Sequence, residues 1–135
     1  MQVFISYAES DEPVARKVVA GLEREGLKVW YDRREVLPGQ NWAESVAKAL
    51  KESSAMVVLI TRAWLSSPRL QREIDYALSD QSFRHRLVPV FVGPPEKLPK
   101  REVPWILQSL KTVSLPERGS PDKGIKEIAD TLKAA

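Results

Sequence analysis

The sequence predicts an α/β domain in which a parallel sheet of five strands lies between helices on both faces. Short apolar runs alternate along the chain with longer segments whose apolar residues recur at helical spacing. Residues 55–60 are apolar at every position, as expected of a parallel strand that is covered on both faces. Strands and helices that alternate in this way form right-handed crossovers, and residues 1–135 have the length of a single domain.

The first part of the chain predicts two strands with a helix between them. Residues 3–5 are a short apolar run, followed by a polar turn in which Ser10 or Asp11 can cap a helix. Gly26 ends this helix, and residues 27–31 predict the second strand. The apolar stripe of the helix consists of Val14, Ala15, Val18, Val19 and Leu22.

A long loop at residues 32–41, punctuated by Pro38 and Gly39, leads into the rest of the chain. The helix after the loop is marked by Trp42, Ala43, Val46, Ala47 and Leu50. The remaining elements are strands at 55–60, 87–92 and 112–115, a helix at about 68–80 and a short segment at 105–110. A closing helix is lined by Ile125, Ile128, Ala129 and Leu132. We expect Trp64 and Trp105 to lie in the core.

Composition argues against several classes of function. The chain has no cysteine and a single histidine, His85, which excludes disulfides and cysteine metal sites and argues against a zinc site. The 21 basic residues are interspersed with 18 acidic ones, so we expect no nucleic-acid partner and a surface position for His85. No apolar stretch approaches the roughly 20 residues that span a bilayer, and we expect a cytoplasmic domain without membrane contact.

Five strands in a chain of this length favour the flavodoxin-like strand order 2-1-3-4-5, a three-layer arrangement. In such sheets the ligand crevice lies beyond the carboxyl ends of the first and third strands. The loop after the first strand is "SYAESD", and the segment after the third strand is "TRAWLSSPRLQRE". Topology therefore places Glu73, the last residue of that segment, on the crevice side of the molecule.

Several chemistries that use this architecture do not fit the crevice. A phosphoacceptor receiver domain needs an acidic residue at the end of the third strand, which here ends in Ile60-Thr61-Arg62. Phosphate cradles need glycines after the first strand, but "SYAESD" has none and carries two acids that repel phosphate. The chain has no G-x-S-x-G nucleophile elbow. The crevice is left with carboxylates, a serine and aromatic side chains.

Glu73 has two interpretations. Its helix has a predicted buried stripe of Leu70, Ile74, Ala77 and Leu78, and Glu73 lies about 85° from the centre of that stripe. Arg69 lies one helical turn earlier, and an exposed pair between the two would contribute about 0.2–0.5 kcal/mol. Helical geometry alone favours this surface pair. A carboxylate at the border of the stripe can also face a pocket, so the functional interpretation stays open.

Four segments of the chain resemble Toll/interleukin-1 receptor (TIR) domains, especially the bacterial ones. They are "FISYAESD", "VWYDRREVLPGQNW", "MVVLIT" and "SSPRLQREIDYAL", and the resemblance extends from Val3 to about Leu132. Its most specific part is the order and spacing of Phe4-Ile5-Ser6-Tyr7, Leu37-Pro38-Gly39 and Glu73. The segment "PWILQ" at 104–108 lies where the family has a third, weaker box.

The resemblance implies one of two functions. Some TIR domains cleave NAD+ at the nicotinamide–ribose bond, releasing nicotinamide and ADP-ribose or cyclic ADP-ribose, in signalling or defence. Their catalytic glutamate aligns with Glu73, so we expect an NAD+ hydrolase or cyclase that needs no cofactor and no metal. The alternative is a non-catalytic module for TIR–TIR interaction in signal transduction. A more distant alternative is a nucleotide sensor that binds in the same crevice without cleaving.

The resemblance also implies residues that bind the substrate around Glu73. They are Ser6, Tyr7, Asp32, Pro38, Gly39, Trp42 and Arg69. Two features depart from the family pattern, because Arg69 replaces the usual aromatic residue and Ala8-Glu9 replaces basic residues that some members carry. Trp42 offsets part of the lost stacking surface. The loop around Pro38 and Gly39 is further implied to mediate homotypic self-association.

Overall fold

The structure is a computed structural model that describes residues 1–79, 86–99 and 101–134. Five strands form one parallel sheet in the order β2-β1-β3-β4-β5, which confirms the predicted flavodoxin-like fold. The strands are β1 (Gln2–Ser6), β2 (Lys28–Trp30), β3 (Ala55–Ile60), β4 (Leu87–Val92) and β5 (Val113–Leu115). The third and fourth strands have the predicted bounds, and the second is shorter than predicted by one residue at each end.

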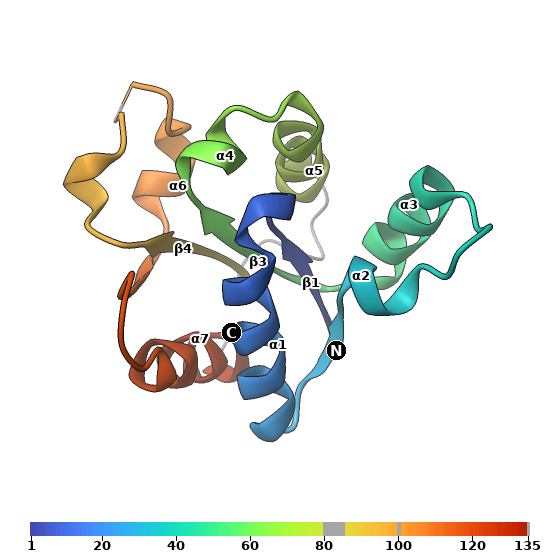
Figure 1. Cartoon of the computed structure of the whole chain (residues 1–135), viewed down its shortest axis with the longest axis horizontal. Coiled ribbons are helices and arrows are strands. Elements are labelled where there is room, and N and C mark those ends of the chain that lie inside the picture. The colour runs from blue at the N-terminus through green and yellow to red at the C-terminus, as the bar shows by residue number, and fades with distance from the viewer. Residues whose placement is uncertain (80–85, 100, 135) are drawn as a thin grey trace.

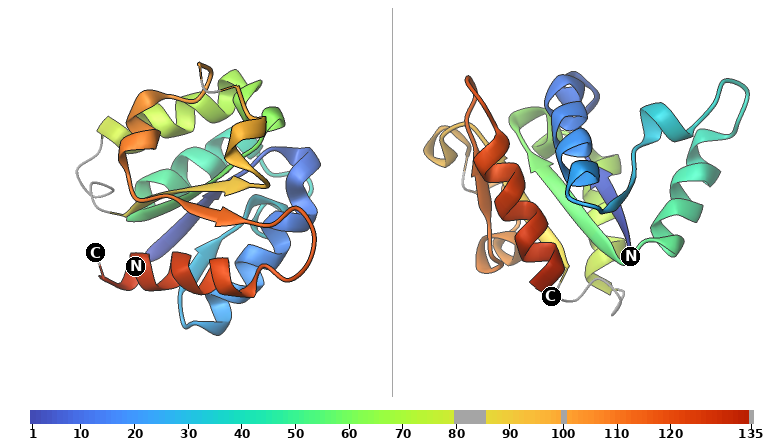
Figure 2. Two further views of the ribbon diagram at one scale, coloured as in Figure 1. Left: turned by 90° about the vertical axis from the view of Figure 1, so that its left-hand side faces the viewer. Right: turned by 90° about the horizontal axis from the view of Figure 1, so that it is seen from below.

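Helices cover both faces of the sheet, and Figure 2 shows the resulting three layers edge-on. One face carries α1 (Glu12–Arg24) and α7 (Asp122–Ala134), which pack side by side. The other face carries α3 (Trp42–Glu52), α4 (Arg62–Leu65), α5 (Pro68–Ser79) and α6 (Trp105–Ser109). Short helices at α2 (Asp32–Glu35), η1 (Glu9–Asp11) and η3 (Pro95–Lys97) lie in the connecting segments (Figure 1).

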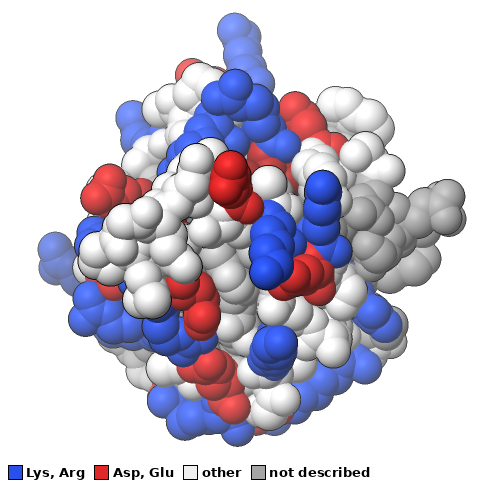
Figure 3. Space-filling view, turned by 90° about the vertical axis from the view of Figure 1, so that its right-hand side faces the viewer, with Lys and Arg blue, Asp and Glu red and all other residues white. Residues whose placement is uncertain are grey.

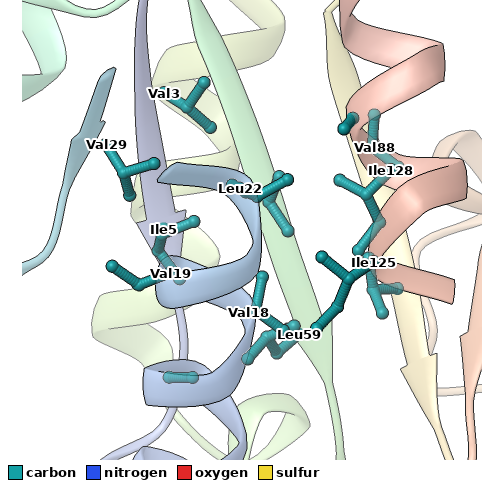
Figure 4. Close-up of a cluster of buried hydrophobic side chains, with 14 of the residues drawn as sticks. Val3, Ile5, Val18, Val19, Leu22, Val29, Leu59, Val88, Ile125 and Ile128 are labelled. Atoms are coloured by element: carbon teal, nitrogen blue, oxygen red, sulfur yellow. The ribbon is translucent and has the colours of Figure 1, made fainter. Parts of the chain in front are cut away.

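Successive residues of each strand supply two separate cores, because side chains alternate across a sheet. In β1, Val3 and Ile5 join the core beneath α1 and α7, whereas Phe4 joins the core on the opposite face. Figure 4 shows the first of these cores, in which Leu22 and Ile128 pack over the sheet. The six residues of β3 are all buried, which explains why this strand carries no polar residue.

Local signals in the sequence account for several helix ends. Gly26 has a φ of +87°, a conformation that glycine adopts without strain, and it follows the last turn of α1 as predicted. The side chain of Asn41 accepts a hydrogen bond from the backbone N–H of Glu44, 3.1 Å away, at the start of α3. The chain between these points differs from the prediction, since α2 forms one helical turn within the loop predicted at residues 32–41.

Some residues that were predicted to be buried are exposed, because the helix that carries them turns a different face toward the core. Trp105 is 76% exposed rather than buried, because it opens a five-residue helix whose buried residue is Leu107, about 200° away around the axis. Leu78 is 43% exposed, and the buried stripe of α5 is instead rotated toward Glu73. Ala43 and Ala47 of α3 are also exposed. Trp64 is fully buried, as predicted.

Asp11 occupies the position before α1, but its side chain makes no capping hydrogen bond. Its carboxylate instead accepts a hydrogen bond from the hydroxyl of Thr61, at the end of β3. His85 and Asp80, which the sequence placed at the surface and at the end of α5, lie outside the described residues. Within the described ranges, no helix has the length and hydropathy that crossing a membrane requires.

Gly21 determines how closely α1 approaches α7, and its replacement tests the packing of this layer. A Cβ atom at Gly21 would lie 2.4 Å from Cγ2 of Ile125. We predict that Gly21→Ala lowers the free energy of unfolding by about 1–3 kcal/mol through this overlap. The loss should appear although alanine is the better helix former by about 1 kcal/mol. Denaturation with urea measures the change.

A double-mutant cycle with Ile125→Ala identifies the cause of that loss. Ile125→Ala alone should lower the free energy of unfolding by about 2–5 kcal/mol, because it leaves a cavity. It also removes the atom that a Cβ at Gly21 would overlap, so Gly21→Ala should cost little in the Ile125→Ala background. An equal cost in both backgrounds would show that the contact between α1 and α7 is not the reason.

Candidate active site

Glu73 is a buried carboxylate on the side of the sheet where the strands end. It lies in the second turn of α5, which follows β3 and α4 along the chain. Only 6% of its surface is exposed, and glutamate is almost never fully buried unless it is paired. The burial contradicts the surface interpretation of Glu73 and directs attention to its partners.

Three side chains surround the carboxylate. The hydroxyl of Ser6, the last residue of β1, donates a hydrogen bond to Oε1 of Glu73 over 2.9 Å. The indole N–H of Trp64 donates to the Ser6 hydroxyl oxygen over 3.1 Å. On the other side, Nη1 of Arg69 lies 3.5 Å from Oε2 of Glu73. The pair predicted between Arg69 and Glu73 is therefore present, but its carboxylate is buried.

Burial raises the pKa of Glu73 to about 7, because the carboxylate loses its hydration. The hydrogen bond from Ser6 and the positive charge of Arg69 act in the opposite direction, and the negative charge of Asp32 adds to the rise. A carboxyl group whose pKa lies near neutrality is a candidate for proton transfer or for charge stabilisation in a reaction.

Arg69 connects Glu73 to a second group of polar and aromatic side chains. Its guanidinium carbon lies 4.4 Å from the centroid of the Trp42 ring, at cation–π distance. The indole N–H of Trp42 donates a hydrogen bond to Oδ2 of Asp32 over 3.3 Å. The hydroxyl of Tyr7 donates to Oδ1 of the same carboxylate. Asp32 opens α2 and Trp42 opens α3, so these bonds tie both ends of the intervening loop to the end of β1.

The phenol of Tyr7 is held in its protonated form. Burial raises the pKa of Tyr7 well above its usual value, and the hydrogen bond to Asp32 adds to the rise. Tyr7 therefore remains a hydrogen-bond donor over the whole physiological range of pH. It stays in place to orient Asp32.

A cleft of about 720 Å³ opens beside this group, within the size range of small-molecule sites. Figure 3 shows this face of the molecule, with acidic and basic side chains around a hollow. The cleft is lined by Tyr7, Glu9, Asp32, Arg33, Val36, Leu37, Pro38, Gly39, Gln40, Trp42 and Arg69. Within the described ranges, no group of three or more His, Cys, Asp or Glu side chains is arranged to hold a metal ion.

Glu73 does not line the large cleft but a second cavity of about 10 Å³ beneath it. The two cavities share four lining residues, which are Tyr7, Asp32, Trp42 and Arg69. A volume of this size holds about one water molecule. The four shared side chains therefore separate Glu73 from the cleft in this conformation.

The cleft brings together six of the seven residues predicted to bind substrate, namely Tyr7, Asp32, Pro38, Gly39, Trp42 and Arg69. Ser6 is the exception, because it is 1% exposed and lies beneath the cleft against Glu73. Sequence analysis missed Glu9 and Arg33, which also line the cleft and lie 3.5 Å apart. The signal for Arg33 was present, since it directly follows Asp32, which was predicted to bind substrate.

Sequence comparison adds information that is independent of this geometry. A family model described as the TIR domain matches residues 3–129. The NAD(+) hydrolase TcpA of Theionarchaea archaeon is 31% identical over 74 residues, which cover 54% of this chain and 22% of the relative. The NAD(+) hydrolase PdTIR of Paracoccus denitrificans is 29% identical over 103 residues, which cover 75% of this chain and 33% of the relative. The chain thus spans between about a fifth and a third of the length of these curated relatives.

Solved structures agree with the sequence comparison. The TIR-STING receptor of C. gigas, in complex with 2',3'-cGAMP, superposes with a TM-score of 0.77 at 26% identity. The match covers 96% of this chain and 38% of the receptor chain. The family model covers almost all of the described fold, including α5, which carries Glu73, and the strands β3 and β4 before and after it. The chain therefore belongs to the TIR domain family.

Proposed function

We propose that the chain cleaves NAD+ at the bond between nicotinamide and ribose, with Glu73 as the catalytic carboxylate. The products are nicotinamide and either ADP-ribose or its cyclic form. The observation that carries the proposal is a buried glutamate with its pKa raised to about 7, placed directly beneath a cleft of about 720 Å³. Two relatives at about 30% identity bear the name NAD(+) hydrolase, which supports the same reaction.

A single carboxylate is sufficient for this chemistry. The C1′–N bond breaks with its electron pair moving onto nicotinamide, which leaves as a neutral molecule and needs no acid. Positive charge develops on the ribose, as in glycoside hydrolysis, and a nearby anion stabilises it. In hydrolysis a water molecule adds to C1′, and Glu73 accepts the proton that this water loses. Glu73 therefore acts in its ionised form.

The cleft offers complementary groups for the rest of the dinucleotide. Trp42 supplies an aromatic face, and the carboxylate of Asp32 is an acceptor for ribose hydroxyls. Arg33 and Arg69 supply guanidinium groups, whose planar donors match phosphate oxygens. We assign the diphosphate to these two arginines, because the first box carries Ala8-Glu9 where some family members have basic residues. Pro38 and Gly39 also line the cleft.

NAD+ reaches Glu73 in this proposal only when Arg69 and Trp42 separate. The cavity at Glu73 has a volume of about 10 Å³, whereas the nicotinamide ring needs several times that space. Arg69 can turn outward, because its side chain is 41% exposed and its contact with Glu73 is long. Once Arg69 has turned outward, its guanidinium faces the cleft, where we assign it to the diphosphate.

The second candidate function is a TIR–TIR interaction module without activity, and two observations favour it. Glu73 is paired and closed off in this conformation. Leu37, beside Pro38 and Gly39, is 60% exposed at the tip of the loop between α2 and α3. We propose that this loop mediates homotypic self-association in either case. A charged or polar residue in place of Leu37 would weaken that association.

The first test measures nicotinamide release from NAD+ at high protein concentration. We predict that Glu73→Gln abolishes release, with a loss of at least about 100-fold, because the neutral amide cannot stabilise the cationic transition state. The matched control is Glu127→Gln, an exposed glutamate of α7 on the opposite face of the sheet. If Glu73→Gln released nicotinamide as fast as the wild type, Glu73 would not be the catalytic carboxylate. No release from a wild type that is crowded or assembled on beads would favour the interaction module.

The second test is the dependence of kcat/KM on pH, which reports the ionisation of the free enzyme. Glu73 acts as the anion, and burial raises its pKa to about 7. We therefore predict that kcat/KM for NAD+ rises about tenfold per pH unit below pH 7 and levels off above it. A profile that is flat between pH 5.5 and 8.5 would contradict the proposal.

The third test concerns stability, because a functional carboxylate in this position weakens the fold. The pKa of Glu73 is raised from 4.5 in the unfolded chain to about 7 in the folded one. Folding therefore favours the protonated form, and stability falls as the pH rises from 4.5 to 7. We predict that the advantage of Glu73→Gln over the wild type grows by about 2 kcal/mol between pH 5 and pH 8. Urea denaturation at both pH values gives the answer, and a constant difference would refute it.

A further inference from the structure

Three buried side chains from distant parts of the sequence form a hydrogen-bonded chain that ends at Glu73. Trp64 of α4 is 0% exposed, Ser6 of β1 is 1% exposed and Glu73 is 6% exposed. The indole N–H of Trp64 lies 3.1 Å from the Ser6 oxygen, and that oxygen lies 2.9 Å from Oε1 of Glu73. A buried indole N–H needs a hydrogen-bond acceptor, and for Trp64 that acceptor is the hydroxyl that also contacts Glu73.

The donor inventory fixes the direction of both hydrogen bonds. An indole N–H can only donate, and an ionised carboxylate can only accept. The Ser6 hydroxyl therefore accepts from Trp64 and must point its single proton at Glu73. If the indole N–H were absent, the hydroxyl could turn toward another acceptor, and Oε1 of Glu73 would lose a fixed donor.

The same chain distinguishes the two oxygens of Glu73. Oε1 is engaged by Ser6 on the core side. Oε2 lies toward Arg69, which lines both the small cavity and the large cleft. Because Ser6 holds Oε1 and Arg69 lies beside Oε2, Oε2 is the oxygen on the side of the small cavity and the cleft above it.

We propose that Trp64 is a positioning residue, which acts through Ser6 to fix Glu73 with Oε2 toward the cleft. Ser6 then has the role of an intermediary in the core rather than a contact for the substrate. The consequence for catalysis rests on the NAD+-cleaving function proposed above, whereas the orientation of Glu73 is a property of the folded chain alone.

Removal of either partner has a different consequence for the core. Among the described residues, no buried side-chain nitrogen or oxygen lacks a hydrogen-bond partner. Trp64→Phe removes a donor and leaves only an unused lone pair on Ser6, which is tolerated. Ser6→Ala leaves both the indole N–H and Oε1 of Glu73 unpaired, which is costly. Trp64→Phe is therefore the cleaner variant, and its ring still fills most of the site.

The experiment is a titration of the Glu73 carboxyl carbon by ¹³C NMR, which requires no enzymatic activity. We expect Trp64→Phe to raise the pKa of Glu73 by about half a unit and Ser6→Ala to raise it by about one unit. The double variant should titrate like Ser6→Ala alone, because Trp64 acts only through Ser6. Trp64→Phe without a shift, or a double variant with the sum of both shifts, would overturn the proposal.

Two controls separate positioning from general effects on the core. Arg69→Ala acts on Oε2, so its effect on the pKa should add to that of Trp64→Phe. Ile60→Val removes one methylene from the core cluster that contains Trp64 and should leave the pKa of Glu73 unchanged. A shift in Ile60→Val as large as that in Trp64→Phe would mean that packing alone is responsible.

A measurement on the wild type covers the case in which Trp64→Phe does not fold. The ¹H and ¹⁵N resonances of the Trp64 indole should titrate with the same midpoint as the Glu73 carboxyl carbon, since the hydroxyl of Ser6 couples them. An indole that does not respond when Glu73 ionises would overturn the proposal without any variant.

Kinetics then add the readout that depends on the proposed reaction. Trp64→Phe should lower kcat several-fold, leave KM for NAD+ unchanged and move the pH profile upward by the shift seen in the titration. If no form of the protein releases nicotinamide, the proposed function fails while the titration still decides how Glu73 is positioned. If release is normal and the titration shows no coupling, the positioning role fails and the function stands.

Discussion

The site depends on one constraint, which is that a carboxylate buried at the end of the sheet must be given partners. Glu73 is brought into the interior by the packing of α5, and its hydration is replaced by a serine and an arginine. Ser6 can reach it only because β1 and β3 are neighbours, paired from Val3 with Ala55 to Ser6 with Val58. The strand order that creates the crevice is thus also the condition for keeping the carboxylate in the core.

The two halves of the site have different surroundings. Glu73, Ser6 and Trp64 lie in the packed region where the ends of β1 and β3 meet α4 and α5. Trp42 lies at the start of α3, which Figure 1 shows at one side of the molecule. The contact between Arg69 and Trp42 joins the packed region around Glu73 to the start of α3, where residues 42–44 are exposed. Under the proposed function, opening of the cavity moves the half-exposed side chain of Arg69 and the part that carries Trp42, while Glu73, Ser6 and Trp64 stay in place.

Sequence patterns predicted the fold better than the site, and particular residues show why. The predicted strands at 55–60 and 87–92 have the observed bounds at both ends, because strands buried on both faces are continuously apolar. Leu78 was assigned to the buried stripe of its helix but is exposed, and helical geometry alone favoured a surface pair for Glu73, which is buried. The partner that makes the burial of Glu73 tolerable is Ser6, 67 residues away in the sequence, and no local pattern encodes that contact. Trp64 was correctly placed in the core, but its N–H bond was invisible for the same reason.

Arg69 partly offsets the cost of ionising Glu73 in the resting chain, because its positive charge lowers the pKa that burial raises. The nicotinamide ring of NAD+ is cationic and planar, so under the proposed function it requires an anion and a flat aromatic face. Arg69 presents a planar cation to the same anion and lies 4.4 Å from the Trp42 ring. Arg69 thereby pairs with the negative charge of Glu73 and covers the ring face of Trp42 at the same time. Under the proposed function, Arg69 and the nicotinamide cation exclude each other from one site, so binding of NAD+ must supply the free energy that displaces Arg69.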